Sequence, residues 1–192
     1  MEYSTHASTV RINDALASNL NKLINAMTKA EFWHKRLANQ CRLQDLRGWG
    51  RWHDVESDCA SDTILCLEKI FADKLGFVPT LDFASLSQTQ ETLANADSFK
   101  MHFGVWEMLK QELIDVTNTV ITTVAQVDMQ IYKKACCMAE RLQDDKTRVR
   151  MCKARLEKAE WGKHDTMICS MLIHKYFEHE HKSGDCYNIN LG

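Results

Sequence analysis

The chain has 192 residues, of which 45% are hydrophobic and 26% are charged, with a net charge of −2. This balance is typical of a globular protein and excludes a disordered chain, and it gives no reason to expect nucleic acid or a membrane surface as a partner. No apolar run approaches the roughly 18 residues of a membrane span, and the N-terminus lacks the pattern of a secretory signal. The expected location is the cytoplasm or another reducing compartment.

Helix-breaking residues are scarce, with one proline and seven glycines in the chain. This scarcity favours long, uninterrupted helices and an all-α fold. The eight cysteines form no Cys-x-x-Cys pair and mostly fall in segments with helical periodicity. We interpret them as reduced, buried thiols, with soft metal ligands or redox thiols as the alternative.

The first helix is predicted from apolar residues at helical spacing between Leu16 and Cys41. Residues 1–12 before it are predicted to be a flexible arm. Gly48 and Gly50 are expected to break this helix.

The second helix is predicted to start near Trp52. It is expected to end at Gly76, a plausible C-terminal cap, because Pro79 follows as a stop signal. Residues 77–96 then show no helical period, which is long for a connection within a domain. Such a link can carry the chain from one end of a bundle to the other.

The third helix is predicted from about residue 97 to Leu142, ending at the polar stretch 143–147, where Asp144 or Asp145 would cap the next helix. The fourth helix is predicted to reach about His181. Gly162 either kinks it or separates a short fifth helix. Residues 183–192 are predicted to be an irregular tail.

Two helices, a long crossover and two further helices are the plan of ferritin-like four-helix bundles. The sequence therefore predicts one such bundle over residues 13–182.

Several stretches resemble known members of that family. The segment NLNKLINAM (19–27) resembles the opening of the first helix of bacterioferritin, and GWGRWHDVES (48–57) is similar to the start of its second helix. LGFVPTLDF (75–83) resembles the turn that begins its crossover. DDKTRVRMCKARLEKAEW (144–161) resembles, more loosely, the fourth helix of the Dps miniferritins.

The resemblance implies oxidation of Fe(II) at a di-iron site in each bundle and storage of mineral in a homo-oligomeric cage. That site needs a Glu on the first and third helices and Glu-x-x-His on the second and fourth. Here Met27 takes the first position, and Thr63 and Cys66 take the second-helix pair. Val116 and Val120 stand where the third-helix carboxylate is expected, and Ile64 replaces the haem-binding methionine. The resemblance thus implies the fold and a cage, with no haem and without the family's ferroxidase ligands.

Glu31 and His34 form a Glu-x-x-His pair that would face inward on the first helix. They are candidate ligands of one metal ion. The alternative is an ordinary buried hydrogen-bonded pair, since a buried carboxylate needs a partner.

Cys59, Asp62 and Cys66 are spaced to share one face of the second helix. Thiolates prefer zinc or copper(I) to iron, so a mixed site is a second candidate. The alternative is plain packing of the two cysteines with Asp62 at an edge.

Two further candidate metal sites fall near the end of the chain. Glu160 and His164 are four residues apart, and His174, Glu178 and His181 share one helical face. The alternatives are a surface ion pair for the first set and a solvated helix end for the second. The tryptophans, Trp33, Trp49, Trp52, Trp106 and Trp161, are interpreted as anchors of subunit contacts.

These observations predict a ferritin-like, self-assembling protein that binds and stores iron, with zinc or copper as alternative metals. Ferroxidase activity would require a rebuilt site, so whether the chain is an enzyme stays open. It would form a homo-oligomeric cage or co-assemble with a related subunit. The alternative function is a non-catalytic scaffold or assembly subunit of a larger complex.

Overall fold

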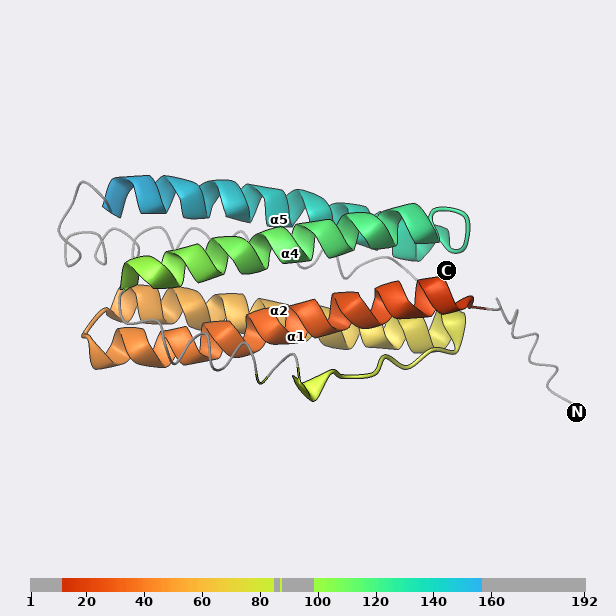
Figure 1. The fold of residues 1–192 in the computed structure, drawn as a ribbon, viewed down its shortest axis with the longest axis horizontal. Helices are drawn as coiled ribbons and strands as arrows, with labels where there is room; N and C mark the ends of the chain where they lie inside the picture. Colours follow the sequence, from red (N-terminus) through yellow and green to blue (C-terminus); the bar gives the residue numbers. More distant parts are fainter. Residues whose placement is uncertain (1–11, 85–86, 88–98, 157–192) are drawn as a thin grey trace, which may run out of the picture.

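The computed structural model describes residues 12–84, 87 and 99–156, which form four long helices. These are α1 (Asp14–Leu43), α2 (Arg47–Leu75), α4 (Phe99–Val124) and α5 (Met129–Leu156). Figure 1 shows α1 and α2 as one antiparallel pair and α4 and α5 as a second pair stacked on it. α2 and α4 run in the same direction. The predicted all-α fold class is confirmed for this part of the chain, and the predicted fifth helix lies outside it.

Both ends of the first helical pair show recognisable capping. The side-chain Oδ1 of Asn13 accepts a hydrogen bond of 2.8 Å from the backbone N–H of Leu16, which satisfies one of the unpaired donors at the start of α1. Gly76 follows α2 with a φ of 59°, a left-handed conformation that glycine adopts without steric cost. The prediction that Gly76 is a C-terminal cap is confirmed.

The glycines after α1 do not act as the sequence suggested. α1 ends at Leu43, and both Gly48 and Gly50 lie inside α2, which begins at Arg47 and not near Trp52. A Cβ atom on Gly50 would lie 3.3 Å from the carbonyl oxygen of Ala38. Gly50 therefore permits a close approach of α2 to α1, and that packing outweighs its low helix propensity.

The boundary between the third and fourth helices was also wrongly predicted. The chain turns at residues 125–128, and the polar stretch 143–147 lies in the middle of α5. Asp128 provides the cap, because its Oδ1 accepts hydrogen bonds from the N–H groups of Gln130 (2.8 Å) and Ile131 (2.9 Å). The stretch 143–147 contains no Gly or Pro, and Asp144 is simply exposed on the helix. The polar character of residues 143–147 was wrongly interpreted as the end of a helix.

The buried apolar residues form two clusters along the bundle. The larger one joins α1, α2, α4 and α5 through aliphatic side chains such as Leu20, Leu67, Val120 and Ile131. The second lies toward the α1–α2 turn and contains most of the aromatic residues, with Trp33, Leu37, Cys41, Trp49, Trp52, Phe103, Trp106, Leu109 and Val149.

The four tryptophans of this second cluster are buried inside the chain, with exposed fractions of 0–3%. Their interpretation as anchors of subunit contacts is therefore wrong for Trp33, Trp49, Trp52 and Trp106. Trp161 lies outside the described residues. The reason for the error is that four indole rings from three helices can pack against one another, which a single sequence does not reveal.

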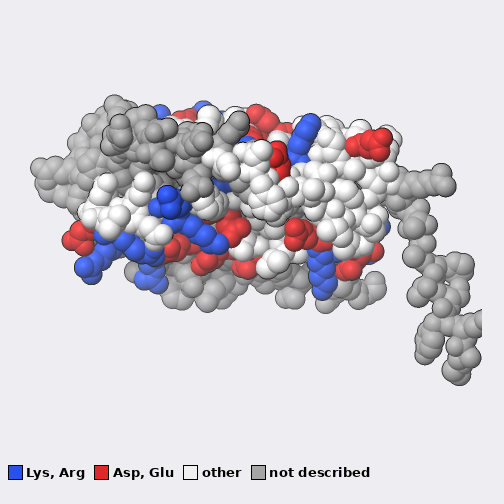
Figure 2. Space-filling model, turned by 60° about the horizontal axis from the view of Figure 1, so that its bottom comes forward, with Lys and Arg blue, Asp and Glu red and all other residues white. Residues whose placement is uncertain are grey.

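The surface carries charges of both signs. Figure 2 shows Lys and Arg side chains interspersed with Asp and Glu on one face of the molecule. Some of them pair across helices, as Lys29 of α1 does with Glu112 of α4 at 3.1 Å. A search of the described helices for a segment long and apolar enough to cross a membrane finds none.

We predict that Asp128→Ala lowers the free energy of unfolding by about 1 kcal/mol, because the first turn of α5 loses its cap. Urea unfolding followed by tryptophan fluorescence measures this change. Asp144→Ala is the matched control, since Asp144 is exposed within α5, and it should change stability by less than about 0.5 kcal/mol. A larger loss for Asp144→Ala than for Asp128→Ala would contradict the observed helix boundary.

Candidate functional site

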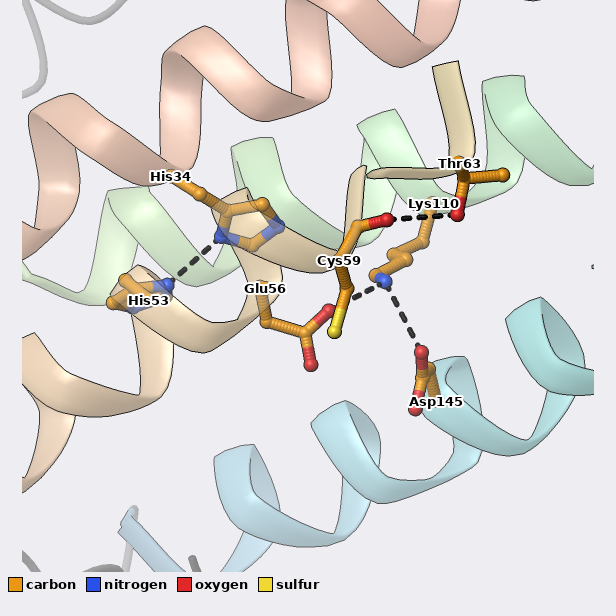
Figure 3. Close-up of polar contacts among 7 residues, drawn as sticks. All are labelled: His34, His53, Glu56, Cys59, Thr63, Lys110 and Asp145. Atoms are coloured by element: carbon orange, nitrogen blue, oxygen red, sulfur yellow. Dashed lines mark hydrogen bonds and ion pairs between the residues drawn. The ribbon is translucent and has the colours of Figure 1, made fainter. Parts of the chain in front are cut away.

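The interior of the bundle contains a buried ion network at the junction of the two apolar clusters. The Nζ atom of Lys110 lies 3.0 Å from Oε2 of Glu56 and 3.3 Å from Oδ2 of Asp145. The side chains of Lys110 and Glu56 are only 7% and 6% exposed. Figure 3 shows Lys110 of α4 reaching between the carboxylates of α2 and α5. One ammonium group thus connects three helices.

A small cavity of about 80 Å³ lies beside this network. All four helices contribute to its wall, which combines apolar side chains with the ion network and four further polar side chains, His34, Cys59, Thr63 and Arg141. Its lining residues are Met27, Ala30, His34, Glu56, Cys59, Ala60, Thr63, Lys110, Leu113, Met138, Arg141, Leu142 and Asp145. The volume suits a few water molecules and is far below the roughly 300 Å³ of an ordinary small-molecule site.

The charge state of Lys110 follows from two opposing effects. Burial acts to lower the pKa of Lys110, because the charged form loses its hydration. The negative charges of Glu56 and Asp145, together with their hydrogen bonds, act in the other direction and raise the pKa of Lys110 above its ordinary value. The ammonium form therefore persists at neutral pH.

A second polar contact lies next to the cavity and joins α1 to α2. The Nδ1 atoms of His34 and His53 are 2.9 Å apart, and the two side chains point toward one another in Figure 3. Both residues are almost fully buried, with exposed fractions of 2% and 1%. Trp33 and Trp106 enclose the pair, with ring centroids 4.8–5.7 Å from the imidazoles.

Helical spacing explains why these residues meet. His53, Glu56, Cys59 and Thr63 follow one another at intervals of three, three and four residues, so they lie along one face of α2. This face points into the bundle, as the burial of His53 and Glu56 shows. A His, a Glu and a Cys on an inward face were a signal in the sequence.

Of the candidate metal ligands named from the sequence, only His34 and Cys59 line the same cavity. Glu31 pairs with Lys35 on its own helix, whereas His34 lies against His53. The expected Glu31–His34 partnership is therefore replaced by two separate contacts. Cys59 lines the cavity, and Cys66, seven residues further along α2, is half-buried. Asp62 is exposed. Glu160, His164, His174, Glu178 and His181 lie outside the described residues.

Four central residues were not among the candidates: His53, Glu56, Lys110 and Asp145. The stripe on α2 could have indicated His53 and Glu56. Lys110 gives no such signal, because lysine is almost never fully buried unless it is paired, and its partners are 54 and 35 residues away along the chain. Asp145 was interpreted as a helix cap, which hid its role as a counter-ion.

Within residues 12–84, 87 and 99–156, no group of three or more His, Cys, Asp or Glu side chains is arranged to hold a metal ion. The carboxylates of Glu56 and Asp145 are both engaged by the Lys110 ammonium. The arrangement neutralises buried charge with the chain's own cation.

Comparisons of this chain with protein-family models, with curated proteins and with solved structures find no match. The site is therefore interpreted from its own chemistry.

We predict that Lys110→Met lowers the free energy of unfolding by about 3–5 kcal/mol at neutral pH, because two interior carboxylates lose their cation. Urea unfolding measures the loss, with Lys69→Met as a control at an exposed position of α2. Equal stability of the two variants would contradict a structural role for the network.

The stability that Lys110→Met loses relative to the native chain should depend on pH. In the native chain the pKa of Lys110 is raised, so its contribution is complete below the unfolded pKa of roughly 10.4 and is lost only as pH rises through the folded pKa. In Lys110→Met the buried Glu56 carboxylate, left without its cation, should take up a proton more readily when the chain is folded than when it is unfolded. Its deficit relative to the native chain should therefore shrink at mildly acidic pH, and a deficit that grows there would contradict this account.

Proposed function

We propose that this chain is a ferritin-like helical bundle that serves as a non-catalytic scaffold or assembly subunit. The observation that carries the proposal is the Lys110 ammonium held between Glu56 and Asp145 in the bundle interior. The order of two antiparallel helical pairs, with α2 and α4 running in the same direction, supports the likeness in fold.

The position of the network supports a relation to the metal centre of that family. Met27 and Thr63 stand where the resemblance places ligands of the first and second helices, and both residues line the cavity beside Lys110. This supports the proposal that the Lys110 ammonium takes the place of the family's metal centre.

Electrostatics explain why a cation on the chain disfavours a metal ion at the same place. A divalent ion would have to displace the ammonium group or lie beside it, and at a few ångströms in a poorly hydrated interior the repulsion is large. Loss of the proton from Lys110 would relieve the repulsion, but the raised pKa opposes that loss. Glu56 and Asp145 therefore act as counter-ions in this proposal.

Iron binding and storage, with zinc or copper as alternatives, remains a prediction of the sequence. It would require ligands other than the engaged carboxylates, and five of the ten candidate residues belong to the stretch after residue 156. A subunit without ferroxidase ligands is still compatible with co-assembly with an active partner.

The surface offers apolar side chains that an assembly contact would bury. Among the described residues, the large hydrophobic side chains that are more than half exposed are Leu43, Leu65, Val78, Phe83, Met108, Met129 and Met151. Because the four described tryptophans are interior, an assembly interface of the described residues would have to use side chains of this kind.

We predict that the purified full chain has a native mass several times the 22.2 kDa of one chain. Sedimentation equilibrium or native mass spectrometry measures it. A single high-mass species would support a closed symmetric assembly. A monomer at micromolar concentration would contradict self-assembly and leave only assembly with an unlike partner.

We also predict that the full chain oxidises Fe(II) no faster than buffer, because the interior carboxylates are held by Lys110. Oxygen consumption after addition of Fe(II) measures the rate, with His34→Ala and Glu56→Gln compared with Asp144→Asn, a control at an exposed position of α5. A rate above background that falls in His34→Ala or Glu56→Gln, but not in the control, would overturn the non-catalytic proposal.

A further inference from the structure

We propose that His34 and His53 form a proton-controlled clasp that holds α1 against α2. The inference is independent of the function proposed above. It begins with the contact between the two Nδ1 atoms, which are 2.9 Å apart although the residues are 19 positions apart in the chain. The centroids of the imidazole rings are 5.2 Å apart and their planes are inclined by 28°, so the rings are close to parallel.

The number of protons on the pair decides whether this contact is favourable. A hydrogen bond between two Nδ1 atoms needs a proton on one and a lone pair on the other. When both rings are neutral, one must be the Nδ1–H tautomer and the other the Nε2–H tautomer. A single added proton keeps the bond, because an imidazolium can donate to a neutral partner. A second added proton places hydrogen on both Nδ1 atoms, and the bond can no longer form.

The surroundings make the doubly protonated state costly. Each imidazole is at least 98% buried, so two like charges would face each other with little water between them. The aromatic walls provided by Trp33, Trp49 and Trp106 carry no net charge.

Charged side chains of all four helices lie on or near the cavity that His34 lines. The cavity that His34 lines also contains Glu56 on the helix of His53, Lys110 on α4, and Arg141 and Asp145 on α5. On α1 itself, Glu31 is engaged by Lys35. Both cavity carboxylates already contact the Lys110 ammonium, and Arg141 adds a further positive charge. This environment can accommodate one imidazolium far better than two.

The direction of the pH dependence follows from proton linkage. In the unfolded chain both histidines take up protons as pH falls below roughly 6.5. The folded chain can hold both protons only after the clasp breaks, so the unfolded or opened state binds more protons and becomes relatively more stable at low pH. Acidification should therefore loosen the turn end of the α1–α2 pair, where the aromatic cluster lies.

The first test uses the native full chain with ¹⁵N-labelled histidine. At neutral pH, two of the eight histidines should show opposite tautomers and a scalar coupling across an Nδ1–H···Nδ1 hydrogen bond. The coupling should disappear at mildly acidic pH together with a change in tryptophan fluorescence. Two identical tautomers at neutral pH, or a coupling that persists after both rings are protonated, would overturn the proposal.

The second test is a double-mutant cycle with His34→Gln, His53→Gln and the double variant. At neutral pH the coupling between the two positions should change the unfolding equilibrium constant by roughly 5-fold in favour of the folded chain. At mildly acidic pH the coupling should vanish or reverse sign. A coupling of equal size at both pH values would overturn the clasp.

The double variant retains the other six of the eight histidines and therefore corrects for their protonation. Failure of the cycle would thus overturn the clasp alone, whereas Fe(II) oxidation above background would overturn only the proposed function.

Discussion

The packing of α2, α4 and α5 depends on one buried cation. Lys110 projects from α4 into the interior and is compensated by Glu56 of α2 and Asp145 of α5. An ammonium group without partners in such a place would be too costly to retain, so the three helices must keep the register that brings both carboxylates to it. The two apolar clusters meet at this point, and the network therefore constrains how the aromatic end and the aliphatic end of the bundle are joined.

This constraint also connects the fold with the proposed function. Four-helix bundles that bind metal pairs surround the metal ions with carboxylates and histidines, so that the ions supply the positive charge at the centre. In this chain a lysine supplies that charge, and the nearest histidine contacts a second histidine. The buried charge of Lys110 is thereby neutralised by side chains of the chain itself, as the proposed structural function requires.

Much of the fold was predictable from local signals, and the errors have identifiable causes. The periodicity of the apolar residues predicted four helices, and Gly76 correctly indicated the end of α2. The boundary at residues 125–128 was missed because its only marker is Asp128, while a more polar stretch at 143–147 is compatible with a helix. In the candidate site, His34 and Cys59 were identified, whereas Lys110 was missed because its meaning depends on residues far away in the chain.

The sequence by itself determined the all-α class, the approximate number of long helices and the inward position of His34, because these depend on spacing along one helix. Only the tertiary structure decided that His34 faces His53, that Glu31 pairs with Lys35, and that Lys110 lies between two carboxylates. The physical reason is that the burial of a charged group depends on its counter-ions. Where these come from other helices, packing alone determines whether a polar residue is a metal ligand, an ion-pair partner or part of the surface.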